Sequence, residues 1–194
     1  MVFDRILELD PGPRRTAALV AWFQGLFEDR REAPVLVGGG AVELYTGGAY
    51  VTGDLDFVGN LTEAVTERLQ DQGFRRRGRH WVHPGAEIFI ELPARTFDRV
   101  VRVDSTAIGE AIVRVLSPED VLVDRLAAWK FWRSSLSGVN AYLIWKERRD
   151  QMDIAWLERS AKSEAVEDAL ANLRAFADRE RGPKEVEQWA SVKR

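Results

Sequence analysis

Residues 35–58 read VLVGGGAVELYTGGAYVTGDLDFV, and this stretch carries most of what the sequence indicates about the fold. Residues 35–37 are a short apolar run, which is typical of a buried strand. The strand is followed by three glycines, Gly38, Gly39 and Gly40. Because glycine has no side chain, backbone N–H groups at such a turn can approach an anion at the start of a helix. We expect that helix to continue over residues 41–45 and the glycine-containing segment 46–48 to end it.

A second feature of the stretch is the pair of aspartates, Asp54 and Asp56, on either side of Leu55. Side chains alternate along a strand, so both carboxylates are predicted on one face and Leu55 on the other, with the two Cα atoms roughly 6–7 Å apart. Two carboxylates so close repel each other, and a divalent cation relieves the repulsion. Glycine turns and Asp-X-Asp pairs are each common without a ligand, but here they occur together on what we expect to be adjacent strands.

With these motifs the chain resembles the nucleotidyltransferase superfamily, which includes DNA polymerase β, poly(A) polymerases and kanamycin nucleotidyltransferases. The resemblance implies a polymerase β-like α/β (α+β) fold, in which helices flank a mixed sheet and a helical extension follows. It implies that Asp54 and Asp56 are catalytic and bind Mg²⁺ or Mn²⁺. The substrate implied is an NTP such as ATP. The nucleotide-binding residues implied are Gly38, Gly39, Gly40 and Lys130.

A narrower likeness is to small bacterial nucleotidyltransferases related to abortive-infection and toxin-antitoxin systems. It is carried by LSPEDVLVDRLAAWKFW at residues 116–132 and RRDQMDIAWL at residues 148–157. This likeness implies transfer of a nucleotide to an acceptor hydroxyl on an RNA end, a protein or a small molecule. It also implies a toxin role with an antitoxin partner. For Lys130, which lies among aromatic residues, packing of the side chain on those rings is the alternative to nucleotide binding.

The superfamily places a third acidic residue on a neighbouring strand, and Glu91 is our choice for this catalytic and metal-binding position. In GAEIFIELP, residues 85–93, acidic and apolar residues alternate as in a strand. Related enzymes more often have aspartate there, so Glu87 and Asp104 remain alternatives. With three carboxylates, the resemblance implies a two-metal, in-line displacement at the α-phosphate of the NTP.

The segment around Glu91 contains further polar residues. The basic run RRRGR at residues 75–79 is predicted either to meet phosphates of RNA or NTP, or to be a solvated edge strand protected by charge. His80 and His83 are three residues apart, so a strand would place them on opposite faces, which argues against a zinc pair.

The composition indicates one compact protein with two regions. The 194 residues are 45% hydrophobic, which suffices for one full core. We expect an α/β core over residues 1–116 and a helical region over residues 117–194, with an amphipathic helix at residues 16–29 and a helix N-cap at Ser117. Cysteine is absent and no apolar run reaches about 18 residues, so we expect a cytoplasmic protein without a membrane segment.

The net charge and the uncertain third acid leave a second function class open. The formal net charge of −3 argues against general coating of nucleic acid, although a local basic surface can hold an RNA end. The alternative to an enzyme is a non-catalytic module that retains the fold and binds a nucleotide or a protein partner. The glycine turn and both aspartates favour the enzyme, whereas the uncertain third acid favours the binding module.

Overall fold

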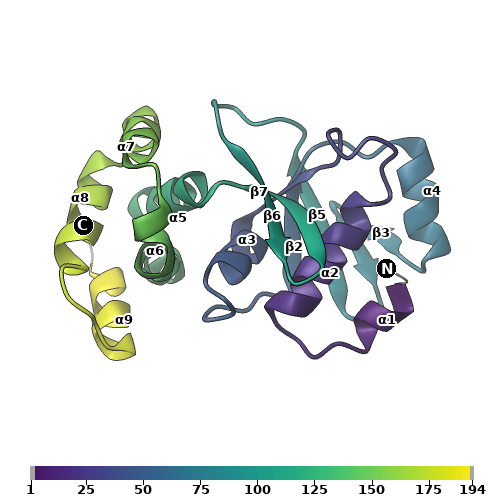
Figure 1. The fold of residues 1–194 in the computed structure, drawn as a ribbon, viewed down its shortest axis with the longest axis horizontal. Helices are drawn as coiled ribbons and strands as arrows, with labels where there is room; N and C mark the ends of the chain where they lie inside the picture. The colour runs from purple at the N-terminus through teal and green to yellow at the C-terminus, as the bar shows by residue number, and fades with distance from the viewer. Residues whose placement is uncertain (1–2, 193–194) are drawn as a thin grey trace. The chain divides into compact units, whose positions relative to one another are not determined.

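The computed structural model describes residues 3–192, and the chain divides into two compact units, Met1–Leu116 and Ser117–Arg194. Figure 1 shows the first unit in purple to teal and the second in green to yellow. The first unit is mixed α/β and the second is helical, which confirms the predicted fold class. Within residues 3–192, no helix is both long and apolar enough to cross a membrane.

The N-terminal unit is built on a seven-stranded mixed sheet with the strand order β3-β4-β5-β2-β1-β7-β6. The strands are β1 (Val35–Val37), β2 (Asp54–Val58), β3 (Arg75–Arg77), β4 (His80–His83), β5 (Ile88–Ala94), β6 (Val103–Ile108) and β7 (Ala111–Leu116). β1 pairs with β7, and β2 with β5, in parallel, whereas the other pairs are antiparallel. The central strands β2 and β1 therefore bring the aspartates next to the glycine turn.

One face of the sheet carries the core of this unit. Its helices are α1 (Phe3–Leu7), α2 (Pro13–Gln24), α3 (Gly38–Tyr45) and α4 (Glu63–Asp71). Phe57 on β2 is fully buried, and its ring centroid lies 4.6 Å from that of Phe23 on α2. Helix α2 begins and ends earlier than the predicted range 16–29. Pro13 suits a first helical turn, and Gly25, a poor helix former, is the C-cap whose N–H donates to the Ala21 carbonyl.

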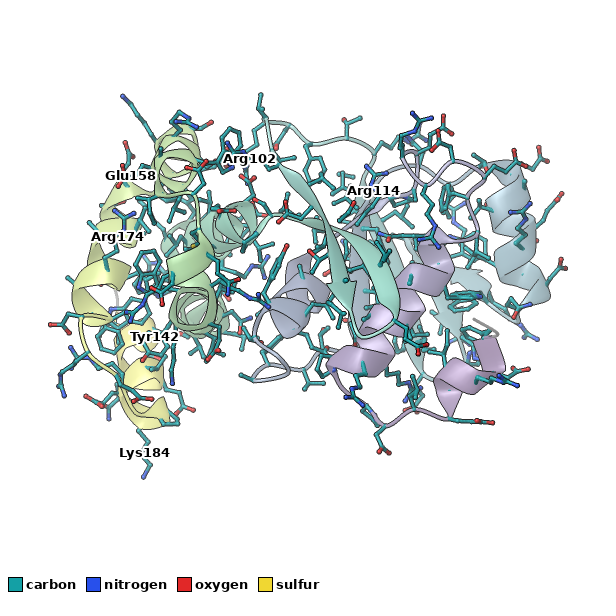
Figure 2. All side chains as sticks on the ribbon, viewed as in Figure 1. Arg102, Arg114, Tyr142, Glu158, Arg174 and Lys184 are labelled. Atoms are coloured by element: carbon teal, nitrogen blue, oxygen red, sulfur yellow. The ribbon has the colours of Figure 1, made fainter. Side chains whose placement is uncertain are left out.

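The C-terminal unit contains α5 (Pro118–Trp132), α6 (Ser135–Arg148), α7 (Ile154–Ser163), α8 (Glu167–Phe176), α9 (Pro183–Ser191) and a 3₁₀ turn (Arg149–Gln151). Ser117 is the N-cap of α5, as predicted, and accepts a hydrogen bond from the Asp120 N–H. The fully buried Asp120 accepts hydrogen bonds from Trp156 Nε1 at 3.0 Å and from the Ser160 hydroxyl at 3.2 Å. On the surface of this unit Arg174 forms an ion pair with Glu158 (Figure 2).

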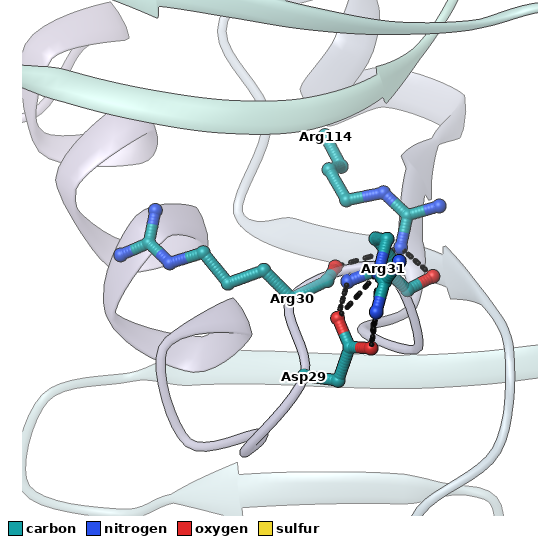
Figure 3. A network of polar contacts seen from close by, with 4 residues as sticks. All are labelled: Asp29, Arg30, Arg31 and Arg114. Atoms are coloured by element: carbon teal, nitrogen blue, oxygen red, sulfur yellow. Dashed lines mark hydrogen bonds and ion pairs between the residues drawn. The ribbon is translucent and has the colours of Figure 1, made fainter.

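The loop that leads into β1 is held by Arg114 of β7. Arg114 Nη1 donates hydrogen bonds to the carbonyl oxygens of Arg30 and Arg31 (Figure 3). It also donates a hydrogen bond to the Ala33 carbonyl at 2.9 Å. The buried Gln24 bridges the same region, because its amide donates to the Pro34 carbonyl and accepts from the Arg114 N–H. These bonds fix the entrance of β1 and therefore the position of the glycines at its end.

The same loop contains an ion pair that predicts how stability depends on pH. Hydrogen bonds from the Arg31 guanidinium and backbone lower the pKa of Asp29 from 3.8 to about 2. Because the pKa of Asp29 is lower in the folded state, the ion pair contributes fully to the stability of the protein at pH values above the unfolded-state pKa. This contribution to stability is lost as the pH falls toward about 2. We therefore expect the difference in unfolding free energy between wild type and Asp29→Asn to shrink between about pH 6 and about pH 3. Urea denaturation at both pH values measures it, and an unchanged difference would contradict the ion-pair explanation.

Candidate functional site

The three glycines form the first turn of α3, and the helix continues over residues 41–45 as expected. Gly38 has φ +62°, a left-handed conformation that turns the chain from strand into helix within one residue. Val37 is the N-cap, and its side chain makes no capping hydrogen bond. A helix N-terminus attracts anions through its partial positive charge and its N–H groups. The turn can therefore act as the phosphate cradle that the sequence predicted.

Asp54 and Asp56 lie on the face of β2 opposite to the core, as the alternation predicted. Leu55 and Phe57 are buried, whereas Asp54 is exposed and Asp56 is half-buried. Asp56 is registered with Val37, the residue before the glycine turn. A Cβ atom added to Gly38 would lie only 2.3 Å from Asp56 Oδ2, so the carboxylate packs directly against the glycine backbone. The structure thus brings the predicted cradle and one predicted metal ligand into contact.

Glu91 is the acidic residue that the sheet register brings to this pair. It is registered with Asp56 on the parallel neighbouring strand, so both side chains lie on the same face. The alternatives are placed differently: Glu87 precedes β5 with φ 52°, and Asp104 is on β6 at the far edge of the sheet. Of the three candidates named from the sequence, the register favours Glu91.

Both oxygens of the Glu91 carboxylate already have cationic or hydrogen-bonding partners. Arg79 Nε lies 2.9 Å from Glu91 Oε1, and His80 Nε2 lies 2.8 Å from Glu91 Oε2. The Glu91 side chain is only 12% exposed, whereas that of Arg79 is 73% exposed. To bind a metal ion, Glu91 would therefore have to give up its contact with Arg79 or with His80. This arrangement could not be predicted from the sequence, because only the pairing of β4 with β5 places His80 opposite Glu91.

A buried acid that the sequence analysis missed, Glu43 of α3, connects the glycine helix to the strand of aspartates. It is fully buried, accepts a hydrogen bond from the Thr16 hydroxyl at 2.9 Å and accepts another from the Thr52 N–H at 3.1 Å. The Thr52 hydroxyl in turn accepts from the Asp54 N–H at 3.3 Å. Glu43 therefore holds the segment that leads into Asp54. The available sequence signal was an acid inside the otherwise apolar helix GGGAVELY.

We expect Glu43→Ala to destabilise the protein by about 3 kcal/mol, because the buried Thr16 hydroxyl and the half-buried Thr52 N–H lose their acceptor. Glu43→Gln should cost less than about 1 kcal/mol. The Gln carbonyl can accept from Thr52, and the Thr16 hydroxyl can rotate to accept from the Gln amide. Urea unfolding of both variants measures these costs. Equal destabilisation by Gln and Ala would show that the carboxyl group itself, and not its hydrogen bonds, is required.

Lys130 lies in the C-terminal unit, and its amine has partners there. Lys130 Nζ donates hydrogen bonds to the Ala165 carbonyl at 2.7 Å and to Asp168 Oδ1 at 2.6 Å, and it lies 5.3 Å from the centroid of the Phe131 ring. The hydrogen bond from Lys130 lowers the pKa of Asp168. These contacts hold the Lys130 amine within the helical unit. Its role in nucleotide binding and the alternative, packing of the side chain on the aromatic rings, both stay predictions.

The donor set suits a divalent cation only in part. Among residues 3–192, no three His, Cys, Asp or Glu side chains are grouped so that they could hold a metal ion. Asp54 and Asp56 supply the carboxylate oxygens that Mg²⁺ prefers, and they share one face of β2. His80 and His83 lie on opposite faces of β4, as predicted, because they are registered with Glu91 and Ile88. The two aspartates are therefore the residues that fit such an ion.

No protein-family model matches the chain, and no curated protein sequence matches it. Among solved structures, it is similar to an antigenic nucleotidyltransferase-like protein from Paracoccidioides brasiliensis. The TM-score is 0.56 at 15% sequence identity, over 92% of this chain and 93% of that one. The fold is nucleotidyltransferase-like. At this identity the similarity establishes the fold alone, and the narrower resemblance to abortive-infection and toxin-antitoxin enzymes stays a prediction.

Proposed function

We propose that the chain is a metal-dependent nucleotidyltransferase that moves a nucleotide from an NTP to an acceptor hydroxyl. The observation that carries this proposal is the contact between Gly38 and the Asp56 carboxylate. It puts an anion-binding helix N-terminus, at the end of β1, next to a carboxylate pair that lies on the face of β2 opposite to the core. A triphosphate with its cation needs both features at once. The nucleotidyltransferase-like fold supports the same activity.

The residues of the site have separable tasks under this proposal. The backbone N–H groups of Gly38, Gly39 and Gly40 bind phosphate oxygens of the NTP. Asp54 and Asp56 hold Mg²⁺ or Mn²⁺ through their carboxylate oxygens. When bound, the cation supplies charge neutralisation at the triphosphate and lowers the pKa of the attacking hydroxyl. Glu91 joins them only after Arg79 or His80 has released one of its oxygens.

A second candidate function is a non-catalytic module that binds a nucleotide. The observation that favours it is the pairing of Glu91 with Arg79 and His80. If these contacts persist when an NTP binds, the third carboxylate stays unavailable and the site binds without turnover. The two functions therefore differ in nucleotide transfer, while both predict nucleotide binding.

Transfer of label from each of four α-labelled NTPs tests the proposal. The protein is incubated with Mg²⁺ or Mn²⁺ and with RNA, protein or small-molecule acceptors in separate reactions. Covalent label in one acceptor class, lost on chelation of the metal, is the expected result. Binding of NTP without any transfer would reject the enzyme in favour of the non-catalytic binding module.

For the toxin role, we expect expression of the wild type to arrest growth. Expression of a variant lacking Asp54 and Asp56 should not arrest growth.

A further inference from the structure

A polar cleft of about 450 Å³ lies beside α4, in the N-terminal unit. Its volume falls within the range of about 300–1,000 Å³ that is usual for small-molecule sites. The polar side chains around it belong to Asn60, Thr66, Gln70, Arg76, Arg79 and Arg95. They come from the end of β2, from α4, from the β3–β4 hairpin and from the end of β5. The cleft thus gathers residues that are distant in the sequence.

The charge of the cleft is one-sided. Arg76, Arg79 and Arg95 contribute guanidinium groups, and none of the residues that line the cleft is acidic. The chain as a whole has a formal net charge of −3, so this concentration of positive charge is local. Arg79 is already paired with Glu91, whereas Arg76 and Arg95 have no ion pair with an acid that lines the cleft. A bound anion reduces the repulsion between the guanidinium groups. The planar, forked guanidinium matches phosphate oxygens in particular.

The remaining walls offer more than a phosphate requires. Asn60 and Gln70 provide amide donors and acceptors, and Thr66 provides a hydroxyl. Trp81 and Leu92 add apolar surface on which a flat ring can lie. We propose that this cleft binds the phosphate of a nucleotide, either a free nucleotide or the terminal nucleotide of a strand. The arginines hold the phosphate, and the neutral side chains contact the sugar and base.

This cleft is distinct from the site at Asp54 and Asp56. Arg76 is registered with Trp81, and Trp81 with Ile90, which places them on the core face of the sheet. The aspartates lie on the opposite face. Arg79 links the two places, because it lines the cleft and also forms the ion pair with Glu91. A phosphate that binds the Arg79 guanidinium would weaken the ion pair between Arg79 and Glu91. The binding site goes beyond the proposed transfer activity and does not depend on it.

Isothermal titration of the full chain with AMP, in EDTA, tests the cleft. EDTA removes metal, so phosphate binding through Asp54 and Asp56 is suppressed. We expect Arg76→Gln and Arg95→Gln each to raise the Kd for AMP at least about tenfold, because each removes charge-assisted hydrogen bonds. Adenosine, which lacks the phosphate, should bind at least about tenfold more weakly than AMP. Arg75→Gln is the matched control, because Arg75 is on the same strand but is registered with Val82 on the opposite face.

Two further arms separate the source of the phosphate and the role of the metal site. The first arm measures binding of a 5′-phosphorylated tetraribonucleotide to the same variants. If it binds more tightly than AMP and depends on Arg76 and Arg95 in the same way, the natural ligand is a strand end. If it binds with the same affinity as AMP, the natural ligand is the free nucleotide. The variant with asparagine at both Asp54 and Asp56 should bind AMP as the wild type does. The proposal is overturned if neither ligand binds, if Arg75→Gln weakens binding as much as Arg76→Gln, or if binding disappears in the double aspartate variant. Intact AMP binding without any nucleotide transfer would reject the proposed enzyme and leave the cleft standing.

Discussion

Simultaneous exchange of Asp54 and Asp56 for asparagine is expected to reduce nucleotide transfer at least about 1,000-fold, a loss of about 4 kcal/mol of transition-state stabilisation. Asparagine keeps the shape of each side chain but removes the negative charge with which the pair would hold a cation. The exposed position of Asp54 and the half-buried position of Asp56 predict a folded variant. Its melting temperature should change by less than about 3 °C, because substitutions of this kind usually alter stability by about 0.5 kcal/mol.

The matched control for this prediction removes two other carboxylates from the same unit. Asp71 ends α4, Asp98 follows β5, and both side chains are exposed. Asp71→Asn combined with Asp98→Asn changes the net charge by the same amount. We expect it to keep transfer within about twofold of wild type, because neither residue belongs to the proposed metal site or lines the cleft beside α4. Label transfer from the preferred NTP measures both variants. Equal transfer by the wild type and the Asp54, Asp56 variant would remove the carboxylate pair from the reaction.

The sequence predicted the features that depend on local patterns. The apolar run of β1, the glycines after it and the alternation around Leu55 are all written within residues 35–58. Strand alternation alone decides that Asp54 and Asp56 share a face, and the structure has both on the face opposite to Leu55 and Phe57. The predicted α/β fold class is confirmed for the same reason, since the central strands β1 and β2 and helix α5 have local signatures.

Features that depend on strand register could not be predicted from the sequence. The partners of Glu91 follow from the pairing of β5 with β2 on one side and β4 on the other. The sequence predicted either phosphate binding or a charged edge for the basic run, and β3 is indeed an edge strand. However, the sequence alone does not show which arginines of β3 lie on which face of the sheet. The register of Arg76 with Trp81 decides this. Glu43 was missed because a buried acid is recognised only from the donors that surround it.

Gly38→Ala is expected to have the second large effect, because it combines backbone strain with a steric clash at Asp56. Alanine at φ +62° costs about 1–2 kcal/mol for the left-handed conformation. The added Cβ would also lie 2.3 Å from Asp56 Oδ2, so the carboxylate or the turn must move. We expect nucleotide transfer to fall at least about 100-fold, since displacement of a reacting group by about 1 Å can cost that much.

The variant Gly47→Ala separates the backbone strain of a left-handed alanine from the steric clash with Asp56. Gly47 has φ +61°, nearly the same as Gly38, but a Cβ added there would meet no atom within 4 Å. Both variants therefore carry the strain, and only Gly38→Ala disturbs Asp56. Urea unfolding should show that Gly38→Ala is less stable than Gly47→Ala by about 1–3 kcal/mol, the usual cost of overpacking. Label transfer by Gly47→Ala should stay within about twofold of wild type, because the strain is confined to the turn after α3. If both variants lose the same stability and the same activity, the strain alone accounts for the effect, and the contact between the glycine turn and Asp56 does not define the site.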